Sequence, residues 1–164
     1  MFEKAKKLGY KNAQRFEFDD YLKRENFTSS WVYVMISSST GDGEFPDNGT
    51  SMHRYLMKCN KEKLDMSHVW FTLLGLGSTD YSTFLGVPIF IHKSLTNLGA
   101  HFFYKFGKAD EATSLEIGIE PWIDGLWDAL QEEMKRKVDI DVKNEKFEEE
   151  KKFFVGTIVE KEKI

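Results

Sequence analysis

The chain lacks the features that mark several classes of protein. Cys59 is the one cysteine among 164 residues, so no internal disulfide and no cysteine-based metal site can form. No run of about 20 apolar residues could span a membrane, and residues 1–7 hold no apolar core of signal-peptide length. Lys and Arg total 23 against 27 Asp and Glu, which argues against nucleic acid as a partner. We therefore expect a cytoplasmic protein in a reducing setting.

Two apolar runs, each followed by a loop of small residues, are the most informative feature present. Residues 31–36 lead into the loop 37–48, and residues 68–74 lead into the loop 75–84. Ligands of open α/β sheets bind outside the carboxyl ends of the strands. The second loop carries Tyr81, so the pattern predicts a flat aromatic ligand held between the two loops.

Strand and helix patterns alternate along the chain, which predicts an α/β fold with a doubly wound parallel sheet. Phe16, Phe18 and Tyr21 alternate with polar residues and predict a short strand. Thr113 or Ser114 can cap a helix that reaches Leu130, and a helix that starts afresh at Pro121 would remove the conflict that proline creates inside it. The other expected strands are 31–37, 68–74, 100–104 and 153–159, and the other expected helices are 2–8, one from about residue 50, and 85–98.

Four motifs give the chain a family resemblance over residues 1–131. They are Ser39–Asn48, Gly75–Tyr81, Leu98–Ala100 and Glu120–Trp127. In this order they resemble the flavodoxin-like FMN domain of the diflavin reductases. This family includes the NADPH–cytochrome reductases and methionine synthase reductase, and the last motif is most similar to the latter. Residues 132–164, rich in Glu and Lys, are expected to form a charged linker or tail that ends in a β-like segment.

The resemblance implies an FMN site built from two loops and one acidic position. Tyr81 would lie on the isoalloxazine ring, and Glu111, beside Asp110, would be the contacting member of an acidic pair. A nearby carboxylate disfavours an anionic reduced flavin. No catalytic side chain and no metal ligand is expected. The full set of implied cofactor-binding residues is Ser38, Ser39, Thr40, Gly41, Leu76, Gly77, Ser78, Thr79, Asp80, Tyr81, Phe84 and Glu111.

The function implied by the resemblance is electron transfer through FMN. Electrons would come from an NADPH/FAD partner domain or polypeptide and pass to a protein acceptor, so this chain is not by itself a complete NADPH-dependent reductase. Asp42, Glu44 and Asp47 could dock a basic acceptor through their charge. The alternative, from another class, is a flavin-free flavodoxin-like binding module or an inactive truncated fragment.

The family pattern begins with a strand and a Ser/Thr-Gly phosphate loop, whereas Met1 falls within the helix that follows them. We therefore expect an N-terminally truncated domain with weak or absent FMN binding. Three outcomes stay open for the gap in the sheet: a product that folds poorly, a tail strand 153–159 that fills the gap, or closure of the flanking strands. A rival interpretation makes residues 37–41 a phosphate loop, although Glu44 and Asp47 are unfavourable neighbours for a phosphate.

Overall fold

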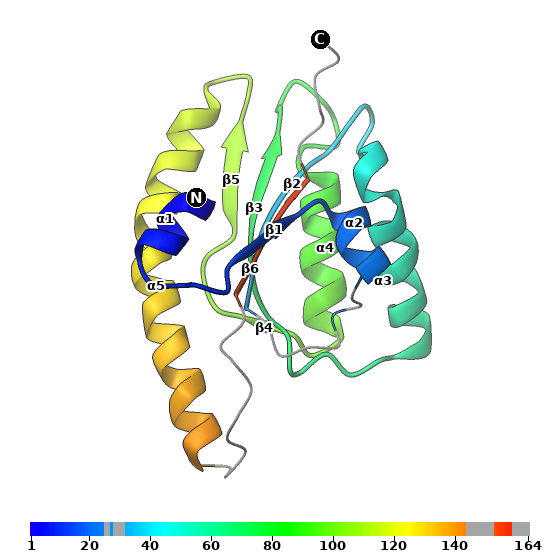
Figure 1. Ribbon diagram of the computed structural model, residues 1–164. Coiled ribbons are helices and arrows are strands. Elements are labelled where there is room, and N and C mark those ends of the chain that lie inside the picture. Colours follow the sequence, from blue (N-terminus) through cyan, green and yellow to red (C-terminus); the bar gives the residue numbers. More distant parts are fainter. Residues whose placement is uncertain (25–26, 28–31, 144–152, 159–164) are drawn as a thin grey trace.

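A parallel β-sheet lies between two layers of helices in the computed structural model of the chain (Figure 1). The structure describes residues 1–24, 27, 32–143 and 153–158. One face of the sheet is covered by α1 (Phe2–Lys7) and α5 (Leu115–Lys143). The other face is covered by α2 (Phe18–Arg24), α3 (Thr50–Glu62) and α4 (Gly86–Asn97). Helices on both faces of a parallel sheet confirm the predicted doubly wound α/β class.

Among the described residues the sheet has six strands, and their order in the sheet departs from their order in the sequence. The strands are β1 (Gln14–Phe16), β2 (Val32–Ser38), β3 (Trp70–Gly77), β4 (His101–Phe102), β5 (Gly107–Asp110) and β6 (Phe153–Ile158). They are arranged as β1-β6-β2-β3-β4, and β5 also pairs with β3. β4 pairs with the start of β3 and β5 with its end, so these two short strands share one place beside β3.

The last strand of the chain fills the place between β1 and β2. β6 is parallel to both neighbours, and Val155 pairs with Arg15 on one side and Val34 on the other. Of the three outcomes left open by the sequence, the structure shows the one in which the tail strand fills the gap. The backbone groups that β1 and β2 turn toward each other thereby gain partners, which removes a large energetic cost. α5 crosses residue 131 without a break, and residues 144–152 and Val159 lie outside the described residues.

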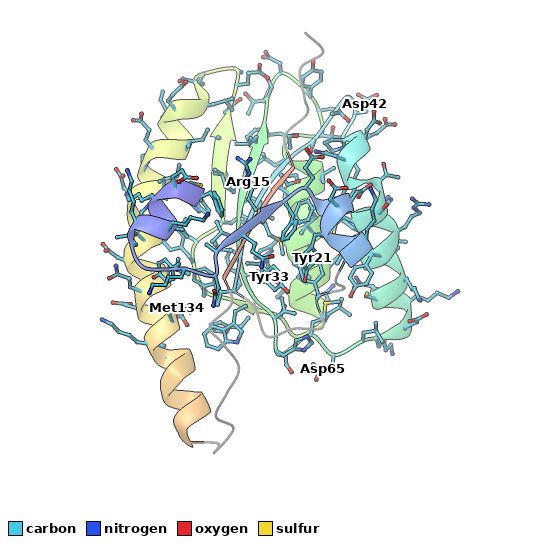
Figure 2. The ribbon with its side chains drawn as sticks, in the orientation of Figure 1. Arg15, Tyr21, Tyr33, Asp42, Asp65 and Met134 are labelled. Atoms are coloured by element: carbon cyan, nitrogen blue, oxygen red, sulfur yellow. The ribbon has the colours of Figure 1, made fainter. Side chains whose placement is uncertain are left out.

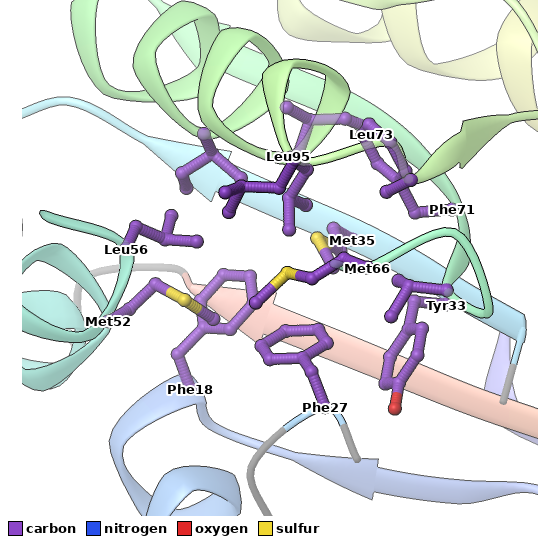
Figure 3. Packing of buried hydrophobic residues seen from close by; sticks show 14 of the residues in the cluster. Phe18, Phe27, Tyr33, Met35, Met52, Leu56, Met66, Phe71, Leu73 and Leu95 are labelled. Carbon is purple, nitrogen blue, oxygen red and sulfur yellow. The ribbon is translucent and has the colours of Figure 1, made fainter. Parts of the chain in front are cut away.

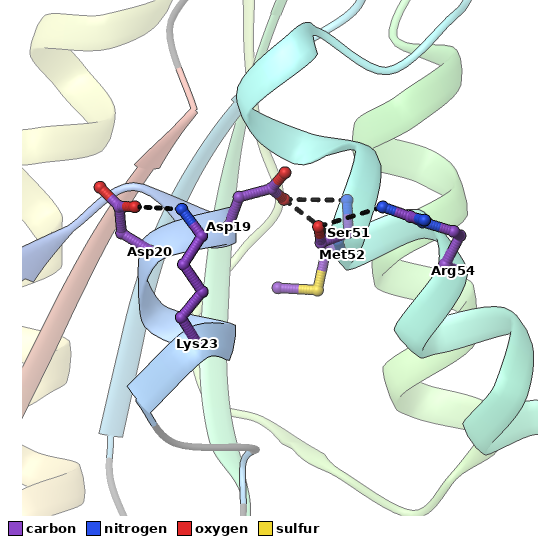
Figure 4. A network of polar contacts seen from close by, with 6 residues as sticks. All are labelled: Asp19, Asp20, Lys23, Ser51, Met52 and Arg54. Carbon is purple, nitrogen blue, oxygen red and sulfur yellow. Dashed lines mark hydrogen bonds and ion pairs between the residues drawn. The ribbon is translucent and has the colours of Figure 1, made fainter.

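The strand predicted across Phe16, Phe18 and Tyr21 is wrong beyond Phe16, where β1 ends and α2 begins two residues later. Phe18 and Tyr21 are three residues apart and therefore lie on one face of a helix, where both are buried. The helix also serves its neighbour, because Asp19 Oδ1 accepts hydrogen bonds from the backbone N–H groups of Ser51 (2.9 Å) and Met52 (3.3 Å) in α3 (Figure 4). An acceptor from another helix thus satisfies two free amides at the start of α3.

The helix expected after Thr113 or Ser114 is confirmed as α5, which starts at Leu115 and runs through Pro121 without the fresh start considered there. Proline removes the hydrogen bond to the carbonyl of residue i−4, here Ile117. Pro121 is exposed and the Ile117 side chain is 71% exposed. This side of the helix therefore faces water, which can hydrogen-bond the freed carbonyl group.

Two clusters of buried side chains, one on each face of the sheet, form the core. On the face covered by α3 and α4, aromatic and methionine side chains such as Phe18 and Met35 meet (Figure 3). On the α5 face the cluster is built around Trp122 and Trp127, which are 2% and 5% exposed. Both tryptophans therefore belong to the core. Cys59 is fully buried.

Candidate functional site

Three loops meet at the carboxyl edge of the sheet. They follow β2, β3 and β5, and the parallel register places their starting points side by side, with Ser38 opposite Leu76 and Gly77 opposite Asp110. Figure 2 marks this end of the molecule by Asp42, whereas Asp65 lies at the opposite end. The arrangement is the one in which open α/β sheets bind ligands.

The loop after β2 is a tight turn from Thr40 to Glu44. The Thr40 N–H donates to the Glu44 carbonyl oxygen at 3.0 Å, and the Glu44 N–H donates back to the Thr40 carbonyl oxygen at 2.9 Å. Gly41 and Gly43 have φ angles of 47° and 95°, a region that favours glycine. A Cβ atom on Gly43 would lie 2.9 Å from the Thr83 Cβ atom, so the first loop packs directly against the second.

Ser39 joins the first loop to the helix that follows the second. Its hydroxyl oxygen accepts a hydrogen bond from the Val87 N–H at 3.0 Å, at the start of α4. By contrast, the hydroxyl oxygens of Ser38 and Thr83 are buried and have no hydrogen-bond partner among the described residues. Buried polar atoms normally have partners, so these two hydroxyl groups have free hydrogen-bonding capacity at the carboxyl edge.

The loop after β3 presents a large aromatic side chain to solvent. Tyr81 is 57% exposed, whereas the neighbouring Leu85 is buried. The turn before Tyr81 is held locally, because the Tyr81 N–H donates to the Ser78 carbonyl oxygen at 3.2 Å and the Asp80 N–H donates to Ser78 Oγ at 3.2 Å. An exposed tyrosine ring on an ordered turn is suited to stacking against a planar ligand.

The loop after β5 is connected to the Tyr81 loop through Asp110. One carboxylate oxygen, Oδ1, accepts from the Thr79 N–H at 3.0 Å and from the Ala112 N–H at 3.0 Å. The other, Oδ2, accepts from Thr79 Oγ1 at 2.7 Å. Hydrogen bonds from the Thr79 backbone and hydroxyl group lower the pKa of Asp110 below its ordinary value.

All of the predicted site residues lie in these loops or in the last residues of β2 and β3. Glu111 is exposed, and its N–H donates to the Gly77 carbonyl oxygen at 2.8 Å. Phe84 is half-buried. Two polar residues of this edge, Thr83 and Asp110, are absent from the predicted set. Whether the predicted residues contact a flavin stays a prediction.

The rival interpretation of residues 37–41 as a phosphate loop does not fit the geometry. The 3₁₀ helix η1 (Asp47–Gly49) and then α3 come well after this loop, not directly behind it. The first free amides of α3 already donate to the carboxylate of Asp19. A phosphate bound there would have to displace a negative charge that is part of the fold.

The described residues do not indicate a metal centre or a membrane span. No group of three or more His, Cys, Asp or Glu side chains among them is arranged to hold a metal ion. In the same part of the chain, none of the helices combines the length and the apolar character needed to cross a bilayer.

A parallel sheet with loops of this kind defines the class of flavodoxin-like α/β domains, and comparison with known proteins identifies the family. The chain belongs to the flavodoxin family, whose profile matches residues 2–122. Among solved structures, a mutant flavodoxin from Pseudomonas aeruginosa has the same fold, with a TM-score of 0.53 and 21% identity over 71% of this chain and 75% of that one.

Relatives of the chain by sequence are large diflavin reductases. Methionine synthase reductase from Bos taurus is 41% identical over 133 residues, which cover 79% of this chain and 18% of that protein. The Rattus norvegicus protein is 39% identical over 66% of this chain and 15% of its own length. NADPH-dependent diflavin oxidoreductase 1 from Danio rerio is 32% identical over 62% of this chain and 18% of that protein. The chain thus spans less than a fifth of these relatives.

Proposed function

We propose that the chain is an FMN-binding electron-transfer domain of the diflavin reductase type. The observation that carries this proposal is the exposed Tyr81 ring on the second of three adjoining loops, at the ligand-binding edge of a flavodoxin-family domain. FMN supplies the redox chemistry when it is bound, because its ring accepts and releases electrons. The protein's part is to bind the ring, orient it and tune its electrostatic surroundings.

The residues at the carboxyl edge fit a flavin. Tyr81 would stack on the ring system, and the unpartnered hydroxyl groups of Ser38 and Thr83 can serve a polar ligand. Glu111 is exposed beside these loops and would place a negative charge near the ring. Such a charge favours the neutral over the anionic form of the reduced flavin. In the family resemblance the FMN phosphate is held by the loop between the innermost strand and the first helix, and no such loop lies among the described residues.

The partners follow from the same proposal. An NADPH/FAD domain or polypeptide would deliver electrons, and a protein acceptor would receive them. Asp42, Glu44 and Asp47 are exposed on or just after the first loop. Their charge would attract a basic acceptor surface. We also propose a cytoplasmic location, as expected from the sequence.

A flavin-free binding module is the second candidate. This candidate is favoured because two of the predicted ligand-binding residues already form hydrogen bonds inside the protein. Ser39 Oγ accepts from the Val87 N–H, and Thr79 donates twice to Asp110. The N–H and O–H groups of Thr79 therefore cannot donate to a ligand without breaking an internal hydrogen bond, whereas the Ser39 hydroxyl group can still donate its proton.

Titration of the purified chain with FMN, followed by quenching of flavin fluorescence, separates the two candidates. We expect saturable binding that Tyr81→Ala weakens about tenfold, because stacked aromatic pairs contribute about 0.5–1.5 kcal/mol beyond their buried area. Met57→Ala is the matched control, since Met57 is 54% exposed on α3 and the Tyr81 ring is 57% exposed. A titration with riboflavin measures what the phosphate adds. A folded chain that binds neither flavin would refute the electron-transfer proposal and leave the binding module.

A further inference from the structure

Asp110 connects two of the three loops, and it does so through both carboxylate oxygens. Thr79 donates to Oδ1 from its backbone and to Oδ2 from its hydroxyl group, at 3.0 and 2.7 Å. Ala112 donates to Oδ1 from the other side, at 3.0 Å. We call Asp110, Thr79 and Ala112 the Asp110 network. It spans the gap between the end of β5 and the loop that follows β3.

The Asp110 network is close to the residue on which flavin stacking depends. Thr79 precedes Tyr81 by two residues in the same turn, and the Tyr81 ring is 57% exposed. The hydrogen bonds that secure the turn from within join Ser78 to Asp80 and Tyr81. Among the described residues, the side-chain hydrogen bonds that tie this turn to another loop are the two between Thr79 and Asp110.

We propose that Asp110 is a positioning residue that holds the Tyr81 loop in place for the flavin ring. This inference rests on the proposed function and adds to it a residue outside the predicted contact set, in which Glu111 is the acidic member. Asp110 acts through Thr79 and does not touch the ligand. Holding a binding loop in one conformation raises affinity because the loop loses less freedom when the ligand binds.

The electrostatics of Asp110 support this role. Its carboxylate accepts hydrogen bonds from two backbone N–H groups and one hydroxyl group, all of which favour the charged form. The side chain therefore stays ionised at neutral pH and keeps all of its capacity as an acceptor. Charged acceptors form the shorter and stronger class of hydrogen bond.

Three variants of the full chain test the proposal. Asp110→Ala removes every acceptor, whereas Asp110→Asn keeps one carbonyl oxygen for the two N–H groups and places an amide near Thr79 Oγ1. Asp65→Ala is the matched control. Asp65 accepts from the Ser67 N–H at 2.9 Å and from Ser67 Oγ at 3.1 Å, but it lies at the opposite end of the sheet (Figure 2). The measurements are FMN titration by fluorescence and hydrogen exchange of the Thr79 amide in the flavin-free protein.

We expect Asp110→Ala to weaken FMN binding about tenfold and to speed exchange of the Thr79 amide, with Asp65→Ala unchanged in both. Asp110→Asn should keep most of the affinity, because position and not charge is the function assigned. The inference would be overturned if Asp110→Ala had the same FMN affinity and the same Thr79 amide exchange rate as Asp65→Ala. It would also be overturned if Asp110→Asn bound FMN as weakly as Asp110→Ala, because the charge of Asp110 would then act directly on the flavin. If the wild-type chain binds no flavin, the proposed function fails, and exchange of the Thr79 amide still decides whether Asp110 holds the loop.

Discussion

Gly118 brings α5 close to β5, and replacing it with alanine should push this helix and strand apart. A Cβ atom on Gly118 would lie 2.7 Å from the Ala109 Cα atom and closer still to the Lys108 carbonyl oxygen. Both are backbone atoms of β5, which cannot turn aside as a side chain can. Carbon atoms pack best at about 3.5–4.0 Å, so the helix or the strand must shift by roughly 1 Å.

The expected cost of Gly118→Ala is the difference between two opposing effects. Overpacking a well-filled interior costs typically about 1–3 kcal/mol, and more where the backbone must move. Alanine in place of glycine within a helix returns about 1 kcal/mol of helix propensity. Because the contact is with backbone, we expect a net loss of about 2 kcal/mol in the free energy of unfolding. With a urea dependence of about 2 kcal/mol per molar, the unfolding midpoint would fall by about 1 M.

The matched control for this prediction is Gly125→Ala in the same helix. It gains the same helix propensity, but the added Cβ atom would meet the hydroxyl oxygen of Tyr104, the far end of a side chain that can move. In urea unfolding followed by circular dichroism, the midpoint urea concentration of Gly118→Ala should therefore be clearly lower than that of Gly125→Ala. A Gly118→Ala protein as stable as the wild type would show that α5 does not pack on β5 as described. Asp110 ends β5, so Gly118→Ala should also weaken flavin binding, whereas Gly125→Ala should not.

Three further predictions test separate parts of the fold. Asp19→Ala should lower the free energy of unfolding, measured by thermal melting, by about 0.5–2 kcal/mol because it removes the acceptor at the start of α3. Asp20→Ala, at the neighbouring surface position, should leave the melting temperature unchanged. Leu126→Ala should cost about 2–5 kcal/mol in urea unfolding because the side chain is fully buried, and Ile117→Ala, 71% exposed, should change little. The lowered pKa of Asp110 contributes stability that is fully present above the ordinary value of 3.8 and is lost as the pH falls through the lowered value. The melting temperature of Asp110→Asn should therefore change less with pH across this range than that of the wild type.

The central strands were predictable because burial on both faces leaves a continuous apolar run. The sequence predicts strands at 31–37 and 68–74, and β2 and β3 occupy Val32–Ser38 and Trp70–Gly77. The end of β3 was read as loop because it contains Gly75 and Gly77. In the structure these glycines remain in the strand, and a Cβ atom on Gly75 would lie 2.9 Å from the Pro88 Cβ atom. Gly75 therefore serves the close approach of α4, and Gly77 the close approach of Phe84 and Leu85 just before that helix.

The error at α2 and the open alternative at α5 both have a local origin. Phe16, Phe18 and Tyr21 satisfy a two-residue alternation at first and a three-residue spacing afterwards, so one short pattern covers the end of a strand and the start of a helix. The average cost of proline inside a helix favours a fresh start at Pro121, yet α5 runs through this residue. That cost depends on whether the freed carbonyl group reaches water, and the exposure of this side of α5 is a property of the packed fold.

The candidate site was predictable in its loops but not in its connections. The glycine-rich motifs and Tyr81 can be read from the sequence, because their residue types suit turns and stacking. The hydrogen bonds between Thr79 and Asp110 join residues 31 positions apart in the chain. Such pairs depend on the register of β3 with β5, in which Gly77 lies opposite Asp110, and no local pattern specifies that register.

The position of β6 shows how a sheet can be completed by a strand from another part of the chain. A parallel strand in the centre of a sheet is held by backbone hydrogen bonds on both sides, and these do not depend on the order in which the strands follow one another. β6 comes last in the sequence and takes the place between β1 and β2, each of which has an edge to be paired there. With β6 on one side and β3 on the other, β2 is paired on both edges as far as Ser37, one residue before the strand ends at Ser38. The first loop of the candidate site therefore starts from a strand that is fixed on both edges, which is the condition that a preorganised binding loop requires.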